Sequence, residues 1–172
     1  MLYGRMPAWA TVAVTLGASL IAVLGTLLGG LVQERRADNR ARQAARSDRI
    51  ARGMDVLARI QILLSDADPD RLGINVNREE PFGTLTPLSN DWHKSYRPAL
   101  ATFALADDSS EVRELGERLG VAVTNSLVAT GWFLRDLTHP TPGGGDTRVR
   151  AVEDHTQARE LAKQLEREIR ES

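Results

Sequence analysis

An uncharged, apolar stretch at residues 7–32 constrains this chain more than any other feature of its sequence. Its 26 consecutive residues carry no ionisable side chain. As an α-helix rising about 1.5 Å per residue, residues 8–32 would measure about 37 Å, which exceeds the ~30 Å of hydrocarbon in a bilayer. Eleven of these positions are Val, Leu or Ile, and each favours insertion by roughly 0.3–0.6 kcal/mol at the helix centre. The sequence therefore predicts a short external tail at 1–7 and a transmembrane helix at 8–32.

The flanks of this stretch favour a membrane anchor over a cleaved secretory signal, whose apolar core spans only about 7–15 residues. Arg5 is the only cation before the stretch, whereas residues 33–52 after it hold seven arginines. Because Lys and Arg beside a span tend to remain in the cytoplasm, we expect the amino terminus outside and the carboxyl terminus inside. We therefore predict a single-pass protein of the inner membrane with 140 cytoplasmic residues.

The first arginines after the predicted span, Arg35, Arg36 and Arg40, are assigned to topology or to contact with anionic lipid. A cation close to an anionic leaflet contributes about 1 kcal/mol, and this attraction decays within a Debye length. Residues 53–172 carry 14 basic and 20 acidic side chains. Because acidic surfaces repel phosphate backbones, nucleic acid is not an expected partner, and a nucleic-acid binder would have to use the arginines of 33–52 alone.

Small residues inside the predicted span suggest that two copies could pack against each other in the bilayer. Gly25 and Gly29 form a GxxxG pair. A second row of small residues consists of Ala18, Ala22, Thr26 and Gly30. Small side chains let two helices approach closely in lipid. Glycine is also simply frequent in membrane spans, so both interpretations stay open.

Residues 33–65 predict an Arg-rich juxtamembrane helix that continues into a folded domain. No proline interrupts them, and apolar residues recur at 3-4 spacing near the end, at Ile50, Leu57, Ile60 and Leu64. Residues 66–90 contain three prolines and two glycines, which exclude a continuous helix and predict a long loop. Within that loop, the alternating residues Leu72, Ile74 and Val76 favour a short extended segment.

Residues 91–172 predict the remaining helices, so that the chain is all-α with a cytoplasmic helical bundle of about four helices. One helix should begin near Ser89 or Pro98, end by Asp107, and present Trp92, Tyr96, Ala99 and Phe103 on one side. Asp108 and Glu111 have the spacing of a capping box for a helix over 109–138. A last helix, from 146 or 147 to about 170, should bury Ala151, Ala158, Leu161, Ala162, Leu165 and Ile169.

Few residues point to chemistry. Asp66, Asp68 and Asp70 imitate the start of a calcium loop, but the glycine and glutamate that such a loop requires are Arg71 and Asn77, so an acidic turn ending a helix explains them better. The three histidines, His93, His139 and His155, have no metal-ligand spacing. His155 falls on the inner stripe of the last helix, where a hydrogen-bonded core histidine is expected. We predict no catalytic residue, metal or cofactor.

The overall layout resembles single-span membrane proteins of high-GC bacteria that have an Arg-rich juxtamembrane helix and a cytoplasmic helical domain. The resemblance rests on the glycine-rich span, the arginine-rich helix, and segments such as EVREL at 111–115 and WFLRDL at 132–137. It implies architecture alone, because no activity or binding residue can be transferred through it.

Three hypotheses for function follow. The first is a non-catalytic interaction, adaptor or regulatory protein at the membrane, which binds another protein or itself and could use Phe82 and Leu85 of the 66–90 loop. The second is an enzyme or small-ligand sensor with a pocket inside the bundle, lined by Trp92, Tyr96, Trp132 and His155. The third is a membrane-tethered nucleic-acid binder that uses the arginines of 33–52.

Overall fold

The structure, a computed structural model, describes residues 8–74, 80, 82–140 and 146–171; within 8–32 it describes the backbone, and the exposure of Gly30 alone. The described residues are helical and contain no strand, which confirms the predicted all-α class. The elements in order are α1 (Ala8–Asp66), α2 (Pro69–Ile74), α3 (Leu85–Asp91), the π-helix η1 (Trp92–Tyr96), α4 (Arg97–Ala106), α5 (Ser110–Thr138) and α6 (Asp146–Glu171).

The chain divides into two compact units, Met1–Ser47 and Asp48–Ser172. In the first unit the backbone is helical from Ala8 onward, and residues 33–47 are exposed. Among the residues whose side chains are described, no helical stretch combines the length and the apolar character needed to cross a bilayer. The predicted transmembrane helix at 8–32 and the tail at 1–7 fall outside those residues, so the structure gives the span no support.

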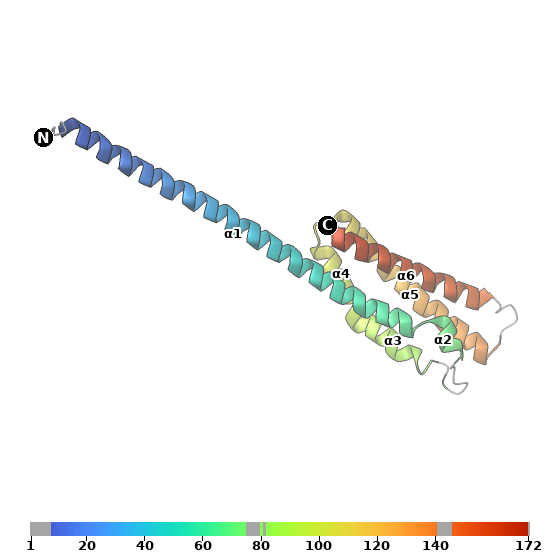
Figure 1. Ribbon diagram of the computed structural model, residues 1–172. Helices are drawn as coiled ribbons and strands as arrows, with labels where there is room; N and C mark the ends of the chain where they lie inside the picture. Colours follow the sequence, from blue (N-terminus) through green and yellow to red (C-terminus); the bar gives the residue numbers. More distant parts are fainter. Residues whose placement is uncertain (1–7, 75–79, 81, 141–145, 172) are drawn as a thin grey trace. The chain divides into compact units, whose positions relative to one another are not determined.

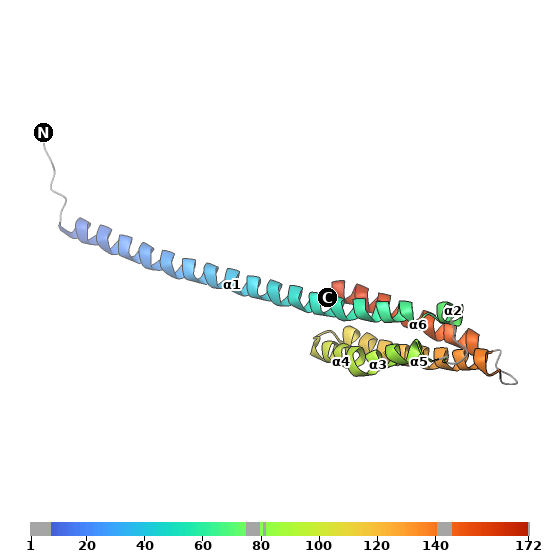
Figure 2. The same cartoon turned by 90° about the horizontal axis from the view of Figure 1, so that it is seen from below.

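The second unit is a bundle of four helical arms, as predicted (Figures 1 and 2). The arms are the end of α1, the continuous stretch formed by α3, η1 and α4, and the two long helices α5 and α6. Figure 1 shows α5 and α6 side by side in opposite directions. Their inner faces, together with those of the other arms, enclose one apolar core. The predicted inner residues of α6 are all buried.

The end of α1 contributes the predicted stripe of core residues. Leu57, Ile60 and Leu64 are each at most 1% exposed. One turn earlier, Gly53 lies where a Cβ atom would be 2.5 Å from the ring of Phe103 and 3.0 Å from Ile169. A glycine at this position therefore lets α4 and α6 approach α1 closely.

The predicted loop at 66–90 contains two short helices. Asp68 begins α2, because its Oδ1 atom accepts hydrogen bonds from the backbone N–H groups of Asp70 and Arg71 at 3.0 and 3.2 Å. Leu72 is buried, since α2 packs on α5 and α6. The extended segment predicted at 72–76 is wrong for 72–74, which are helical, and residues 75–79 lie outside the described part.

The π-helix η1 precedes Pro98 and explains a shift in the buried stripe. Proline lacks an N–H group and its ring clashes with the carbonyl four residues earlier; here the N–H of Arg97 instead bonds to the carbonyl of Trp92, five residues back. Trp92 is fully buried, as predicted, but Leu100 takes the buried place predicted for Ala99, which is exposed. The extra residue of a π turn rotates everything after it by about 100°.

The start of α5 differs from the predicted capping box. Ser109, not Asp108, caps the helix, and its hydroxyl oxygen accepts a hydrogen bond from the N–H of Val112 at 3.3 Å. Asp107 supports this turn by accepting a hydrogen bond from the N–H of Ser109 at 2.9 Å. The helix then runs to Thr138, as predicted.

Candidate functional site

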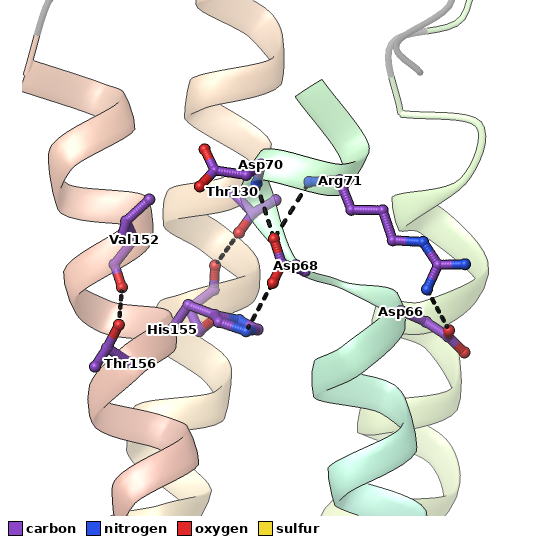
Figure 3. Close-up of polar contacts among 9 residues, drawn as sticks. Asp66, Asp68, Asp70, Arg71, Thr130, Val152, His155 and Thr156 are labelled. Atoms are coloured by element: carbon purple, nitrogen blue, oxygen red, sulfur yellow. Dashed lines mark hydrogen bonds and ion pairs between the residues drawn. The ribbon is translucent and has the colours of Figure 1, made fainter. Parts of the chain in front are cut away.

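A buried polar cluster joins α2, α5 and α6 around His155 (Figure 3). Nδ1 of His155 lies 3.3 Å from the Ser126 hydroxyl, and Nε2 lies 3.9 Å from Oδ2 of Asp68. Ser126 is fully buried and His155 is 4% exposed. The prediction of a hydrogen-bonded core histidine at 155 is confirmed. Its contact with Asp68, the residue that caps α2, connects that short helix to α6.

The electrostatics of this cluster favour a neutral imidazole. Burial lowers the pKa of His155 below its usual 6.5, the nearby Asp68 carboxylate raises that pKa in part, and Arg159 lowers it. Ser126, Asp68 and His155 are the residue types of a hydrolytic triad, but a nucleophile must reach a substrate carbonyl. The burial of the Ser126 hydroxyl therefore argues against acyl transfer and for a structural contact.

A polar pocket of about 330 Å³ borders this cluster on the α2 and α6 side. Its wall includes Asp68, Asp70, His155, Arg159 and Lys163. Nε2 of His155 is buried beside it and has no hydrogen-bond partner among the described residues. The pocket wall therefore combines His155, whose Nε2 atom is itself buried, with a mixture of acidic and basic groups.

The three aspartates that imitate a calcium loop have separate partners. Asp66 pairs with Arg71 at 3.6 Å, and Asp70 pairs with Arg148 at 2.8 Å, while Asp68 caps α2. In the described part of the chain, no group of three or more His, Cys, Asp or Glu side chains could hold a metal ion. The acidic turn that ends α1 accounts for these residues.

The four residues predicted to line a pocket inside the bundle have separate surroundings. Trp92 donates a hydrogen bond from Nε1 to Oγ1 of Thr124 at 3.0 Å, whereas His155 contacts Ser126. Trp132 is 53% exposed, and the half-buried Tyr96 packs against the core. Of the four, His155 alone lines the polar pocket. The predicted common cavity is not formed by them.

The candidate residues near the predicted span lie mostly outside the described side chains. This holds for Gly25, Gly29, Ala18 and Ala22, while Gly30 is exposed and has open space where a Cβ atom would be. Further along α1, the side chains of Arg35, Arg36 and Arg40 are exposed. They remain accessible for the lipid contact predicted from the sequence.

One arginine of the 33–52 group is part of the bundle instead. Arg49 is half-buried, and its Nε atom lies 3.4 Å from Oδ2 of Asp107, which is 3% exposed. The two residues are far apart in the sequence, so no local pattern indicates the pair. A buried carboxylate requires such a partner because isolated charge is costly to remove from water.

The outer face of α5 is an apolar feature that the sequence analysis missed. Val121, Val128 and Trp132 are 58%, 54% and 53% exposed and follow one another at 7-4 spacing along the helix. The guanidinium of Arg135 lies 5.3 Å from the centroid of the Trp132 ring. The repeat of apolar residues on the side of α5 away from its buried stripe is visible in the sequence and could have revealed this face.

Beside this face, α4 and α5 enclose an apolar cleft of about 270 Å³. The small residues Ala104, Gly116 and Gly120 are among those that line it. A Cβ atom on Gly116 would lie 2.7 Å from the Cβ of Ala104, whereas one on Gly120 would meet nothing within 4 Å. Leu105, 69% exposed, and Val121 form its rim. The cleft thus extends the outer face of α5 sideways.

Phe82 and Leu85, which the sequence analysis proposed as docking residues of the 66–90 loop, differ in exposure. Phe82 is 42% exposed, whereas Leu85 is 6% exposed and belongs to the core. Only Phe82 could contact a partner directly. The chain matches no protein-family model, no curated protein and no solved structure, so its function must be argued from these contacts.

Proposed function

We propose that this chain is a single-pass inner-membrane protein whose cytoplasmic bundle is a non-catalytic interaction module, with the outer face of α5 as its binding surface. The observation that carries the proposal is the exposed apolar row of Val121, Val128 and Trp132. Large exposed apolar groups gathered in one place are typical of protein interaction sites, and Trp and Arg are enriched at their energetic centres.

The membrane part of the proposal rests on the sequence of residues 7–32 and on the arginines that follow it. The buried side chains of the second unit support the interaction part. Ser126 and His155 are occupied by contacts within the core, whereas the apolar residues of α5 have no covering element among the described residues. A bundle whose buried polar side chains contact one another and whose helix α5 exposes an apolar row is better suited to docking than to chemistry.

Purification of the tagged full-length chain in mild detergent, followed by crosslinking and mass spectrometry, tests the interaction. Wild type should retain a partner protein or a second copy, and Val128→Glu should lose it. Gln157→Glu, the same introduced charge on the exposed side of α6, should retain it. A wild-type chain that is monomeric and without any partner would contradict the proposal.

Sidedness is tested separately, because the sequence contains no cysteine. A Ser172→Cys variant should be protected from an impermeant thiol reagent in intact cells and should react after lysis. Labelling in intact cells would show that the carboxyl terminus lies outside.

A second candidate function, small-ligand binding, is favoured by Nε2 of His155, which is buried at the polar pocket without a hydrogen-bond partner among the described residues. Its test is the NMR shift of the His155 ring during titration with acetate or inorganic phosphate. Saturable shifts that His155→Gln removes would support it, and unchanged spectra at high concentration would exclude both anions.

A further inference from the structure

We propose that the partner docked on the outer face of α5 is a second copy of this chain, paired antiparallel across a two-fold axis at Asn125. This inference rests on the proposed function, since it names the partner of that same surface. The contact row consists of seven residues, Glu114, Arg118, Val121, Asn125, Val128, Trp132 and Arg135. We call this row the α5 seam.

The α5 seam has the spacing of a coiled-coil stripe. Its residues follow one another by alternating steps of four and three, over three heptads, and all seven are exposed. A strict 3-4 repeat keeps one face of a helix against a partner helix. The buried side of α5 follows its own, wider stripe around Leu119, Val123 and Leu134, so the seam is additional to the residues that fold the bundle.

The order of residues in the seam is self-complementary when the second helix runs in the opposite direction. With Asn125 at the two-fold axis, Val121 faces the partner's Val128. One step further out, Arg118, which lies 3.8 Å from Glu114 of its own chain, faces the partner's Trp132, a cation–π arrangement added to the one that this ring makes with Arg135 of its own chain. At the ends, Glu114 faces the partner's Arg135. Each of these contacts occurs twice because a two-fold interface is isologous.

The same seam is unfavourable in a parallel pair, because every residue then meets its own copy. Glu114 would face a second glutamate, and Arg118 and Arg135 would each face a second arginine. Like charges placed directly against each other oppose association. Asn125 at the centre would pair with its own copy in either direction, and a polar residue between two apolar positions, here Val121 and Val128, favours the register in which it meets a polar partner. The charges therefore select the antiparallel arrangement.

The strength of the pair follows from its size. Residues 114–135 span about 32 Å of helix at ~1.5 Å per residue, and the seam holds only three large or branched apolar side chains. Interfaces of this extent fall at the small end of specific contacts, so the pair should be reversible. The adjoining cleft, with Leu105 at its rim, adds apolar surface at the edge of the seam.

This pairing differs from self-association through the predicted span. Because α1 and α5 run in the same direction in the bundle (Figure 1), an antiparallel pair places residue 48 of the two copies at opposite ends. Two chains anchored in one bilayer can form this pair only with their α5 helices parallel to the membrane plane and the two-fold axis along the membrane normal. Two spans packed through Gly25 and Gly29 would run side by side and place equivalent residues next to each other. Crosslinks within α5 distinguish the two modes.

Single cysteines in the full-length, otherwise cysteine-free chain provide the test. Asn125→Cys lies on the axis and should form a covalent dimer in mild detergent. Val121→Cys alone and Val128→Cys alone should not form one, because the two copies of the same cysteine are then about 12 Å and about 9 Å apart along the helix, beyond the ~7 Å that a disulfide tolerates between Cα atoms. An equimolar mixture of Val121→Cys and Val128→Cys chains should crosslink. Gln157→Cys on α6 is the matched control and should stay monomeric.

A charge reversal tests the ends of the seam. Glu114→Arg should weaken dimerisation about tenfold, because arginines then face each other. Combining it with Arg135→Glu in the same chain restores opposite charges across the axis and should restore the dimer. Since all these positions are exposed, circular dichroism should show an unchanged fold.

Two results would overturn the inference. Crosslinking of Val121→Cys and Val128→Cys each with itself would indicate a parallel pair. A purified chain that forms no crosslink at Asn125→Cys would exclude a second copy at this surface. If, in that case, Val128→Glu still abolishes the capture of another protein from membranes, the proposed function stands and this inference alone is wrong.

Discussion

Two glycines one turn apart in α5 should respond in opposite ways to the same substitution. A Cβ atom at Gly116 would lie 2.7 Å from the Cβ of Ala104, whereas at Gly120 it would meet nothing within 4 Å. Alanine in place of glycine inside a helix contributes about 1 kcal/mol of stability through backbone preference. Gly120→Ala should therefore raise the free energy of unfolding by about 1 kcal/mol.

At Gly116 the same gain is offset by a clash that no side-chain rotation relieves, because the opposing atom is the Cβ of an alanine. The two helices must separate, and overpacking of this kind costs about 1–3 kcal/mol. Gly116→Ala should therefore be neutral or destabilising by up to about 2 kcal/mol. The two variants should differ by about 1–3 kcal/mol, although each adds one methyl group to the same helix.

Reversible urea unfolding of the full-length chain in mild detergent, followed by tryptophan fluorescence and circular dichroism, measures this difference. Ala104→Gly in the Gly116→Ala background should recover the packing loss, so the double-mutant cycle should show a coupling of about 1–3 kcal/mol. Equal stabilisation by both glycine substitutions, or no coupling with Ala104, would refute the close approach of α4 and α5 at this point.

Three further predictions concern polar contacts of the bundle. Thr124→Val should lower the free energy of unfolding by about 1–3 kcal/mol, because Nε1 of the buried Trp92 loses its acceptor. Thr156→Val is the control: the Thr156 hydroxyl donates to a carbonyl of its own helix, so its loss should change the free energy of unfolding by less than about 0.5 kcal/mol. Urea unfolding of the two variants measures both values. Burial lowers the pKa of His155 below 6.5, so the unfolded chain binds more protons than the folded chain at mildly acidic pH. The stability contributed by neutral His155 should be complete above pH 6.5 and should be lost as the pH falls toward the lowered pKa of the folded state. The melting temperature of His155→Gln should therefore depend less on pH in this range than that of the wild type. An equal pH dependence in the two proteins would contradict the assignment to His155. Asp68→Ala removes the cap of α2 and should lower the free energy of unfolding by about 0.5–2 kcal/mol. Relative to the wild type, amide hydrogen exchange should accelerate more in α2 than in α5.

The helical architecture was predictable because the caps, prolines and apolar stripes act locally. The end of α1, the limits of α5 and the inner residues of α6 follow from such patterns. The π-helix was not predictable, because the apolar residues around Pro98 fit a regular period of 3.6 residues and no local pattern marks the π turn at Trp92–Tyr96. One inserted residue was enough to exchange Ala99 for Leu100 in the core.

The contacts between distant segments were beyond local patterns. The pair of Arg49 and Asp107 joins α1 to the turn before α5, and nothing in the sequence distinguishes Arg49 from the six other arginines of residues 33–52. The position of His155 on the inner stripe was predictable from its spacing. Its partners were not, because Ser126 and Asp68 come from two other elements.

The packing of α4 on α5 also determines which residues of α5 reach a partner. Gly116 and Ala104 let the two helices touch, and this contact is one of those that hold α5 in its orientation in the bundle. With that orientation, Leu119 and Val123 point into the core while Val121 remains 58% exposed. An alanine at 116 forces α4 and α5 apart, and we expect this displacement to shift the seam as well as loosen the core. Gly116→Ala should therefore lower the crosslinking yield of Asn125→Cys, whereas Gly120→Ala should leave it unchanged, which connects the stability of the bundle to the surface proposed for its function.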